Sequence, residues 1–132
     1  MSVLLIWSSS HAIAFFVTQI ISTAFASLIW KIFPNGVVRP TINNHSNINH
    51  RILNLIYNHD KDCNGLPSGH VLHSFVSCYY LAKVFPQAWI LFVGILFAIC
   101  ISTLTIKQHY YIDMVATLLL TPILIEISTM II

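Results

Sequence analysis

The tetrapeptide Pro67-Ser68-Gly69-His70 has the residue types of an anion-binding site at the start of a helix. The first turn of a helix offers unpaired N–H groups and the positive end of the helix dipole. Ser68 adds a hydroxyl donor, Gly69 lets a ligand approach the backbone closely, and His70 can give or take a proton near neutral pH. The same residues are equally typical of an ordinary helix cap, with Ser68 as the capping residue. The tetrapeptide alone therefore leaves both interpretations open.

His109 and Asp113 form a second group of residues that could take part in catalysis. Residues four apart share one face of a helix, and an aspartate beside a histidine fixes its tautomer and stabilises the imidazolium form. Asp113 also lies about one turn inside an apolar run, where an ionisable side chain is costly and is a functional candidate by default. The alternative is a structural polar pair that anchors the end of the helix.

Two cations complete the set of candidates. Arg39 precedes Pro40, and arginine is the side chain best shaped to bind phosphate through two parallel hydrogen bonds. Lys107 can add a point charge to the same anion. Basic residues beside membrane helices also bind lipid headgroups, and for Arg39 alone that interpretation is the favoured one.

Together these residues predict phosphoryl transfer through a phosphohistidine intermediate. Arg39, Lys107, Ser68 and the N–H of Gly69 would hold the phosphate. His109 would be the nucleophile, which divides the displacement into two in-line steps. His70 would protonate the leaving oxygen and then activate the incoming water or alcohol. Because cations of the protein neutralise the phosphate, we expect no metal and no other cofactor.

The composition places this chemistry in a membrane. The chain has 132 residues, of which 57% are hydrophobic and 8% charged, against about 25% charged residues in a typical soluble domain. So few charges cannot cover the surface of a small water-soluble globule. The formal net charge of +2 is too small to indicate a nucleic-acid partner. We therefore expect an integral membrane protein.

Hydropathy and breaker residues divide the chain into five helices within a single membrane domain, residues 1–132. Four apolar runs predict membrane-spanning helices, and one amphipathic segment predicts a short helix at the membrane interface. In chain order the helices cover about 3–32, 47–58 (interfacial), 68–85, 88–106 and 109–131. Short connections favour an up-and-down all-α bundle. The first spanning helix then ends, the second begins, the third ends and the fourth begins on one side, where all the candidate residues lie.

Taken in chain order, three motifs of this sequence resemble those of the type 2 phosphatidic acid phosphatase superfamily. That superfamily contains lipid phosphate phosphatases and phosphotransferases. The segment from Lys31 to Arg39-Pro40 looks like the first motif, Pro67 to His70 matches the second, and the third has the expected spacing at Ser102, His109 and Asp113. The resemblance implies the same roles as above: His109 as nucleophile, Asp113 as its partner, His70 as acid and base, and Arg39, Ser68 and Gly69 at the phosphate.

The chain departs from the family pattern at three places. Lys31 lies one residue too far from Arg39, and Thr103 replaces the arginine of the third motif. The sequence Lys107-Gln108-His109-Tyr110 is more similar to the inositol phosphorylceramide synthase-like branch, in which Lys107 would supply the missing cation. The family usually has six membrane helices, so this chain with four resembles a short form. Lys31, His73 and Ser102 are further candidates, although for His73 a core position is the favoured interpretation.

The resemblance implies a lipid phosphate as substrate: a phosphatidic acid-like lipid, an isoprenoid phosphate or a sphingolipid headgroup. It leaves hydrolysis and transfer open, and it implies a site on the outer, periplasmic face of a bacterial inner membrane. Membrane lipids and a second copy of the chain are the other expected partners. Two alternatives remain: an inactive or truncated relative that only binds lipid, and a non-enzymatic membrane protein that binds metal or haem through histidine. Against the latter, the histidines cluster at one end, where Arg39 and Lys107 would repel a cation.

Overall fold

The computed structural model describes residues 6–7, 9–34, 36, 48–59, 65–106 and 110–132. These residues form helices, and no strand occurs in this part of the chain, so the all-α prediction is confirmed. The elements are α2 (Ala12–Ile32), α3 (Ile48–His59), α4 (Gly69–Val84), the short 3-10 helix η1 (Pro86–Ala88), α5 (Trp89–Thr105) and α6 (Tyr111–Ile131).

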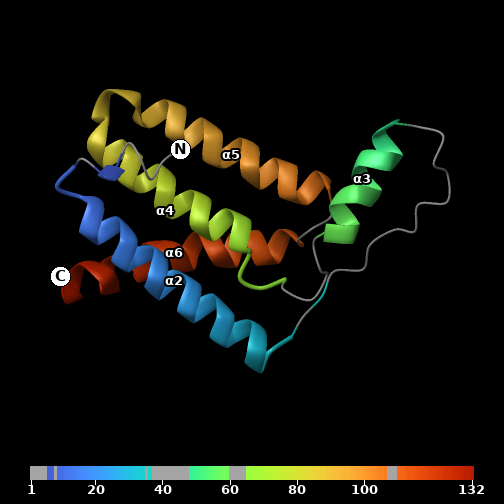
Figure 1. The fold of residues 1–132 in the computed structure, drawn as a ribbon, viewed down its shortest axis with the longest axis horizontal. Coiled ribbons are helices and arrows are strands. Elements are labelled where there is room, and N and C mark those ends of the chain that lie inside the picture. The colour runs from blue at the N-terminus through green and yellow to red at the C-terminus, as the bar shows by residue number, and fades with distance from the viewer. Residues whose placement is uncertain (1–5, 8, 35, 37–47, 60–64, 107–109) are drawn as a thin grey trace.

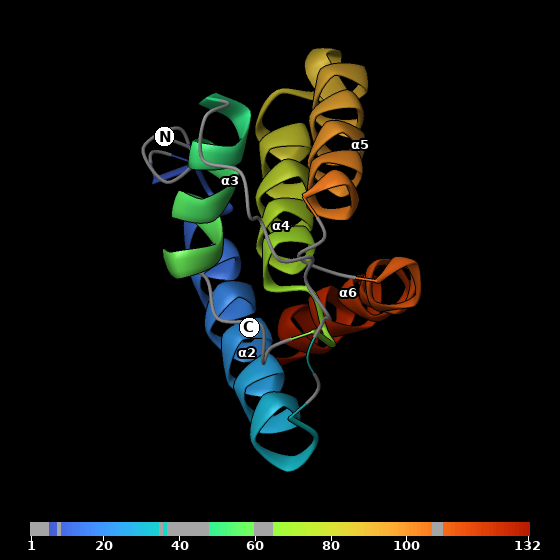
Figure 2. The same cartoon turned by 90° about the vertical axis from the view of Figure 1, so that its right-hand side faces the viewer.

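Helix α4 is the central helix of the bundle. It packs against α2, α5 and α6, and α2 also packs against α6, whereas α5 packs mainly against α4 (Figures 1 and 2). As the short connections predict, α2 ends, α4 begins, α5 ends and α6 begins at one end of the bundle (Figure 1). We call this the motif end, since Pro67 to His70 and Asp113 lie there.

Three helical segments are long and apolar enough to cross a membrane: Ala12–Ile32, Pro86–Thr105 and Tyr111–Ile131. The remaining predicted spanning helix, residues 68–85, differs, because α4 has 16 residues. At 1.5 Å per residue it is about 24 Å long, shorter than the hydrocarbon core of about 30 Å. Phe85 precedes Pro86, and the residue before a proline is disfavoured in the helical conformation, so α4 ends at Val84. Its neighbours α2, α5 and α6 shield much of this short helix.

The first predicted helix, about 3–32, needs a correction at its beginning. Helix α2 starts only at Ala12, because Ser9 interrupts the helical hydrogen bonding. The Ser9 hydroxyl donates to the Ile6 carbonyl at 2.6 Å and accepts from the His11 N–H at 3.3 Å. Such local bonds from serine to the backbone compete with a continuous helix.

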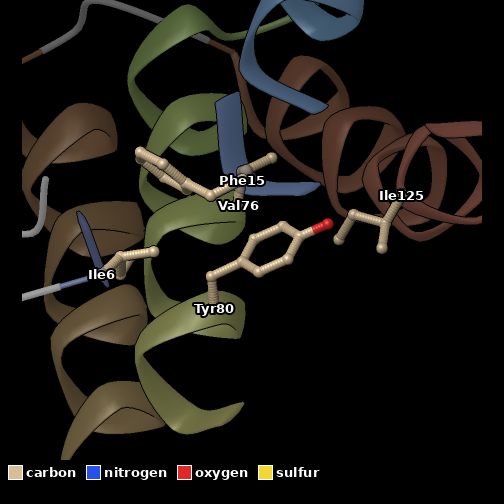
Figure 3. Packing of buried hydrophobic residues seen from close by; sticks show 5 residues of the cluster. All are labelled: Ile6, Phe15, Val76, Tyr80 and Ile125. Atoms are coloured by element: carbon tan, nitrogen blue, oxygen red, sulfur yellow. The ribbon is translucent and has the colours of Figure 1, made fainter. Parts of the chain in front are cut away.

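The largest apolar cluster lies toward the end opposite the motif end. Figure 3 shows its buried members, which come from the N-terminal segment, α2, α4 and α6: Ile6, Phe15, Val76, Tyr80 and Ile125. The Tyr80 hydroxyl is within 2.8 Å of the Thr18 hydroxyl, which is itself 2.5 Å from that of Ser128. Thr18 and Ser128 are small residues that let α2 and α6 approach closely and bond to one another, as in other membrane bundles, and Tyr80 joins this hydroxyl cluster from α4.

Helix α3 corresponds to the predicted interfacial helix 47–58. It lies at the motif end, beside the end of α5 (Figure 1). The Tyr57 hydroxyl donates a hydrogen bond of 2.9 Å to the Ile106 carbonyl, which ties α3 to the residue after α5. Its interfacial placement stays a prediction.

Candidate active site

The start of α4 is tied to α2 and to α6. The indole N–H of Trp30, in the last turn of α2, donates to the Pro67 carbonyl at 3.1 Å. The backbone N–H of Ser68 donates to the Thr117 hydroxyl of α6 at 2.8 Å. Because both bonds hold backbone groups, they fix the path of the chain into α4, whichever side chains the motif presents.

Ser68 is the N-cap of α4, as one of the two sequence interpretations predicts. Its side chain is fully buried, and its hydroxyl oxygen accepts from the Val71 N–H at 3.5 Å. That distance makes the bond a weak one. The capping role is therefore present in the structure, and phosphate binding by Ser68 stays a prediction.

Gly69 is the first residue of α4 and lies against Trp30. A Cβ atom at this position would come within 3.3 Å of Cη2 and 3.5 Å of Cζ2 of the indole. A side chain at this position would therefore press on the indole, which would have to move by a few tenths of an ångström. Within the described part of the chain no side chain or carbonyl accepts from its N–H, which is one of the donors that the first turn of a helix leaves open.

His70 and His73 lie one turn apart on α4 but in different surroundings. The His70 side chain is exposed at the motif end. His73 is half-buried, and its Nδ1 atom is 2.7 Å from the amide oxygen of Gln19 on α2. The exposed ring is the one that a substrate can reach, in agreement with the predicted acid and base role of His70, which stays a prediction.

Asp113 is buried in the first turn of α6, with 4% of its surface exposed. Its Oδ2 atom accepts a hydrogen bond of 3.0 Å from the backbone N–H of Tyr110. The carboxylate thus caps its own helix and stabilises the positive end of the helix dipole. The sequence left a structural pair of Asp113 and His109 as the alternative, and that pair is not tested, because His109 lies outside the described residues. The cap bond occupies one carboxylate oxygen of Asp113, and the other oxygen can accept from a second partner.

Thr117 joins the two motif segments. Its hydroxyl accepts from the Ser68 N–H and donates to the Asp113 carbonyl at 2.6 Å. The start of α4 and the first turn of α6 are therefore brought together through one buried side chain. Sequence reasoning missed Thr117 and Trp30. The only signal for Thr117 was its spacing of four residues from Asp113, and Trp30 gave none.

The remaining candidates divide between described and undescribed residues. Arg39, Lys107 and His109 lie outside the described residues, so the predicted cation pair and the His109–Asp113 pair are not tested. Lys31 and Ser102 are exposed at the ends of α2 and α5. Thr103, which replaces the family arginine, is buried, and its hydroxyl donates to the Cys100 carbonyl at 2.9 Å.

The model of the PAP2 superfamily matches residues 10–131, nearly the whole chain. The chain belongs to this superfamily. The match confirms the resemblance drawn from the three motifs and supports phosphatase or phosphotransferase activity on phosphate esters. It does not distinguish the inositol phosphorylceramide synthase-like branch from the others. No curated protein and no solved structure matches this chain.

Proposed function

We propose that this PAP2 superfamily member is a membrane phosphohydrolase or phosphotransferase that acts on a lipid phosphate through a phosphohistidine at His109. The observation that carries the proposal is the Thr117 bridge between Ser68 and Asp113. It supports a shared site because it joins the helix start that offers an open Gly69 N–H to the first turn of α6. His109 directly precedes Tyr110, the N-cap of that helix.

In the proposed first step, His109 attacks the phosphorus atom and the bond to the ester oxygen breaks. His70 gives its proton to the leaving alkoxide. In the second step, neutral His70 takes a proton from water or an alcohol, whose oxygen attacks phosphorus and releases His109. Arg39, Lys107 and the Gly69 N–H neutralise the phosphate oxygens throughout, which is the main catalytic requirement of phosphoryl transfer.

The position of the site supports a lipid substrate. The motif end is one end of a bundle whose α2, α5 and α6 are apolar enough to cross a membrane. A phosphate held there lies at the level of lipid headgroups, while an attached hydrocarbon stays beside the helices. We place the site on the outer face of the membrane, as the family resemblance implies, and we keep the inositol phosphorylceramide synthase-like branch as part of the proposal.

The test compares purified wild type with His109→Ala in detergent, with phosphatidic acid as substrate and EDTA present. We expect phosphate release or transfer by the wild type, inhibition by vanadate as a mimic of the transferring phosphate, and a loss of at least a thousandfold in the variant. Equal rates for the two proteins would contradict the mechanism. Binding of phosphatidic acid without turnover would favour the inactive lipid-binding relative.

A further inference from the structure

We propose that a polar strip on α4, made of His73, Ser74 and Ser77 and oriented by Gln19 of α2, binds the polar linker next to the phosphate of the substrate. By linker we mean the hydroxyl, ester or amide groups between the phosphate and the hydrocarbon. Phosphatidic acid and sphingoid phosphates have such groups, and isoprenyl phosphates have none. The inference rests on the proposed function and narrows its substrate class to lipids with a polar linker.

The hydrogen bonds of Gln19 fix the tautomer of His73. The Gln19 amide nitrogen lies 3.5 Å from the His73 carbonyl oxygen and 3.4 Å from the Ser77 hydroxyl. Since a carbonyl only accepts, the nitrogen must face it, and the amide oxygen then faces His73 Nδ1 at 2.7 Å. Nδ1 therefore bears the hydrogen. In the neutral ring this leaves Nε2 as a hydrogen-bond acceptor.

The strip borders a groove between α4 and α5 with a volume of about 310 Å³. His73, Ser74 and Ser77 form its polar part, and its remaining lining is apolar: Cys78, Leu81, Phe92, Ile95 and Ile99. Along α4, at 1.5 Å per residue, His73 lies about 6 Å and Ser77 about 12 Å from Gly69, whereas Leu81 lies about 18 Å away. On the α4 side, the lining of the groove is therefore polar near the motif end and becomes apolar with distance from it.

The change from polar to apolar lining matches a lipid that has a phosphate, then a polar linker and then a hydrocarbon chain. A phosphate at the start of α4 would place the first few atoms beyond it beside the strip and the hydrocarbon beside Leu81 and Phe92. Polar side chains in membrane helices usually face the bundle interior, and those that line a groove instead are candidates for substrate contacts. An isoprenyl phosphate would leave His73 Nε2 and the two serine hydroxyls beside bare hydrocarbon, which is unfavourable.

The test measures kcat/KM for phosphatidic acid and for farnesyl phosphate in the same mixed micelles. The wild type should prefer phosphatidic acid. The His73→Phe variant should lose about tenfold more activity toward phosphatidic acid than toward farnesyl phosphate, the range expected for one or two neutral hydrogen bonds. His73→Gln, which keeps hydrogen-bonding groups, should recover part of the preference. The control Leu81→Ala, in the apolar part of the groove, should lower both activities alike.

Two results would overturn the inference while leaving the proposed function intact. One is a wild type without preference between the two lipids, and the other is an equal loss on both in His73→Phe. If neither lipid is turned over, the proposed function fails. The strip is then tested by thermal protection of the wild type and of His73→Phe by a phosphonate analogue of phosphatidic acid. Weaker protection of the variant supports the strip, and equal protection overturns it.

Discussion

The starts of α4 and α6 are the two halves of the candidate site, and they are held in different ways. The start of α4 is fixed by other helices, through Trp30 of α2 and Thr117 of α6. The start of α6 is fixed from within its own first turn, where Asp113 accepts from the Tyr110 N–H. The family motif thus contains the residue that holds α6 but neither of the two that hold α4.

This difference determines at which residues a mutation can change the support of the helix without changing the proposed catalytic role. At α4 the two supports that come from other helices, Trp30 and Thr117, are distinct from the motif, so each can be changed alone. At α6 one carboxylate caps the helix and, in the proposed mechanism, orients His109. Only a replacement of the same shape can remove one role of Asp113 and keep the other.

The largest effect is expected from Asp113→Asn. Asparagine keeps an oxygen for the Tyr110 N–H but lacks the charge that stabilises the imidazolium, so turnover should fall about a thousandfold with the helix content unchanged. Circular dichroism and phosphate release measure the two quantities. Asp113→Ala should lose the same activity and also about 1 kcal/mol of stability, because the cap disappears. An Asp113→Asn variant with wild-type turnover would leave Asp113 as a cap alone.

The next effect concerns the bridge between the two helix starts. Thr117→Val removes the acceptor of the Ser68 N–H, and a buried donor left unpaired costs about 1–3 kcal/mol. Thr121→Val is the matched control, because the Thr121 hydroxyl donates only to the Thr117 carbonyl of its own helix among the described residues. Thermal unfolding in detergent should show a clearly larger loss for Thr117→Val. Similar losses in both variants would mean that the bridge does not stabilise the start of α4.

A smaller effect is expected at the contact between Gly69 and Trp30. Gly69→Ala places a methyl group 3.3 Å from the indole, so the indole or the start of α4 has to give by a few tenths of an ångström, and we expect turnover to fall about tenfold. Because Trp30→Phe also removes the indole bond to Pro67, the two changes are compared in a double-mutant cycle, and Gly69→Ala should slow turnover less in the Trp30→Phe background than in the wild type. Equal slowing in both backgrounds would show that the loss does not arise from this contact.

The smallest effect on stability is expected for Ser68→Ala. The cap bond to the Val71 N–H is long, so its loss should cost about 0.5 kcal/mol, at the low end for an N-cap. Thermal unfolding measures this cost, and phosphate release tests the second role. If the hydroxyl binds phosphate, turnover should fall about tenfold, and unchanged turnover would leave Ser68 as a cap only.

Most of the helix order was predictable, because apolar runs and breaker residues are local signals. The runs 68–85 and 88–106 agree with α4 and α5 within a residue, and Pro86 explains the boundary between them. The prediction failed at the start of the first helix, where the Ser9 side chain competes for the Ile6 carbonyl. Hydropathy averages over such a side chain and does not register its hydrogen bonds.

The placement of the motif residues was predictable, but the side chains that support them were not. Ser68, Gly69 and Asp113 were chosen from residue type and spacing, and they lie at one end of the bundle, while their roles in chemistry stay predictions. Trp30 and Thr117 were missed because their roles depend on which helices touch, and no local pattern encodes that. Similarly, the tautomer of His73 follows only from Gln19, which lies 54 residues earlier in the chain.

The most direct test of the central proposal is to trap the phosphorylated enzyme. Wild type and His109→Ala are mixed with phosphatidic acid that is radiolabelled in the phosphate, quenched in alkali during turnover and separated from lipid. Phosphohistidine survives alkali and is lost in mild acid. We predict acid-labile label on the wild type and none on His109→Ala. Equal label on both proteins, or an unlabelled wild type that still releases phosphate, would contradict the phosphohistidine mechanism.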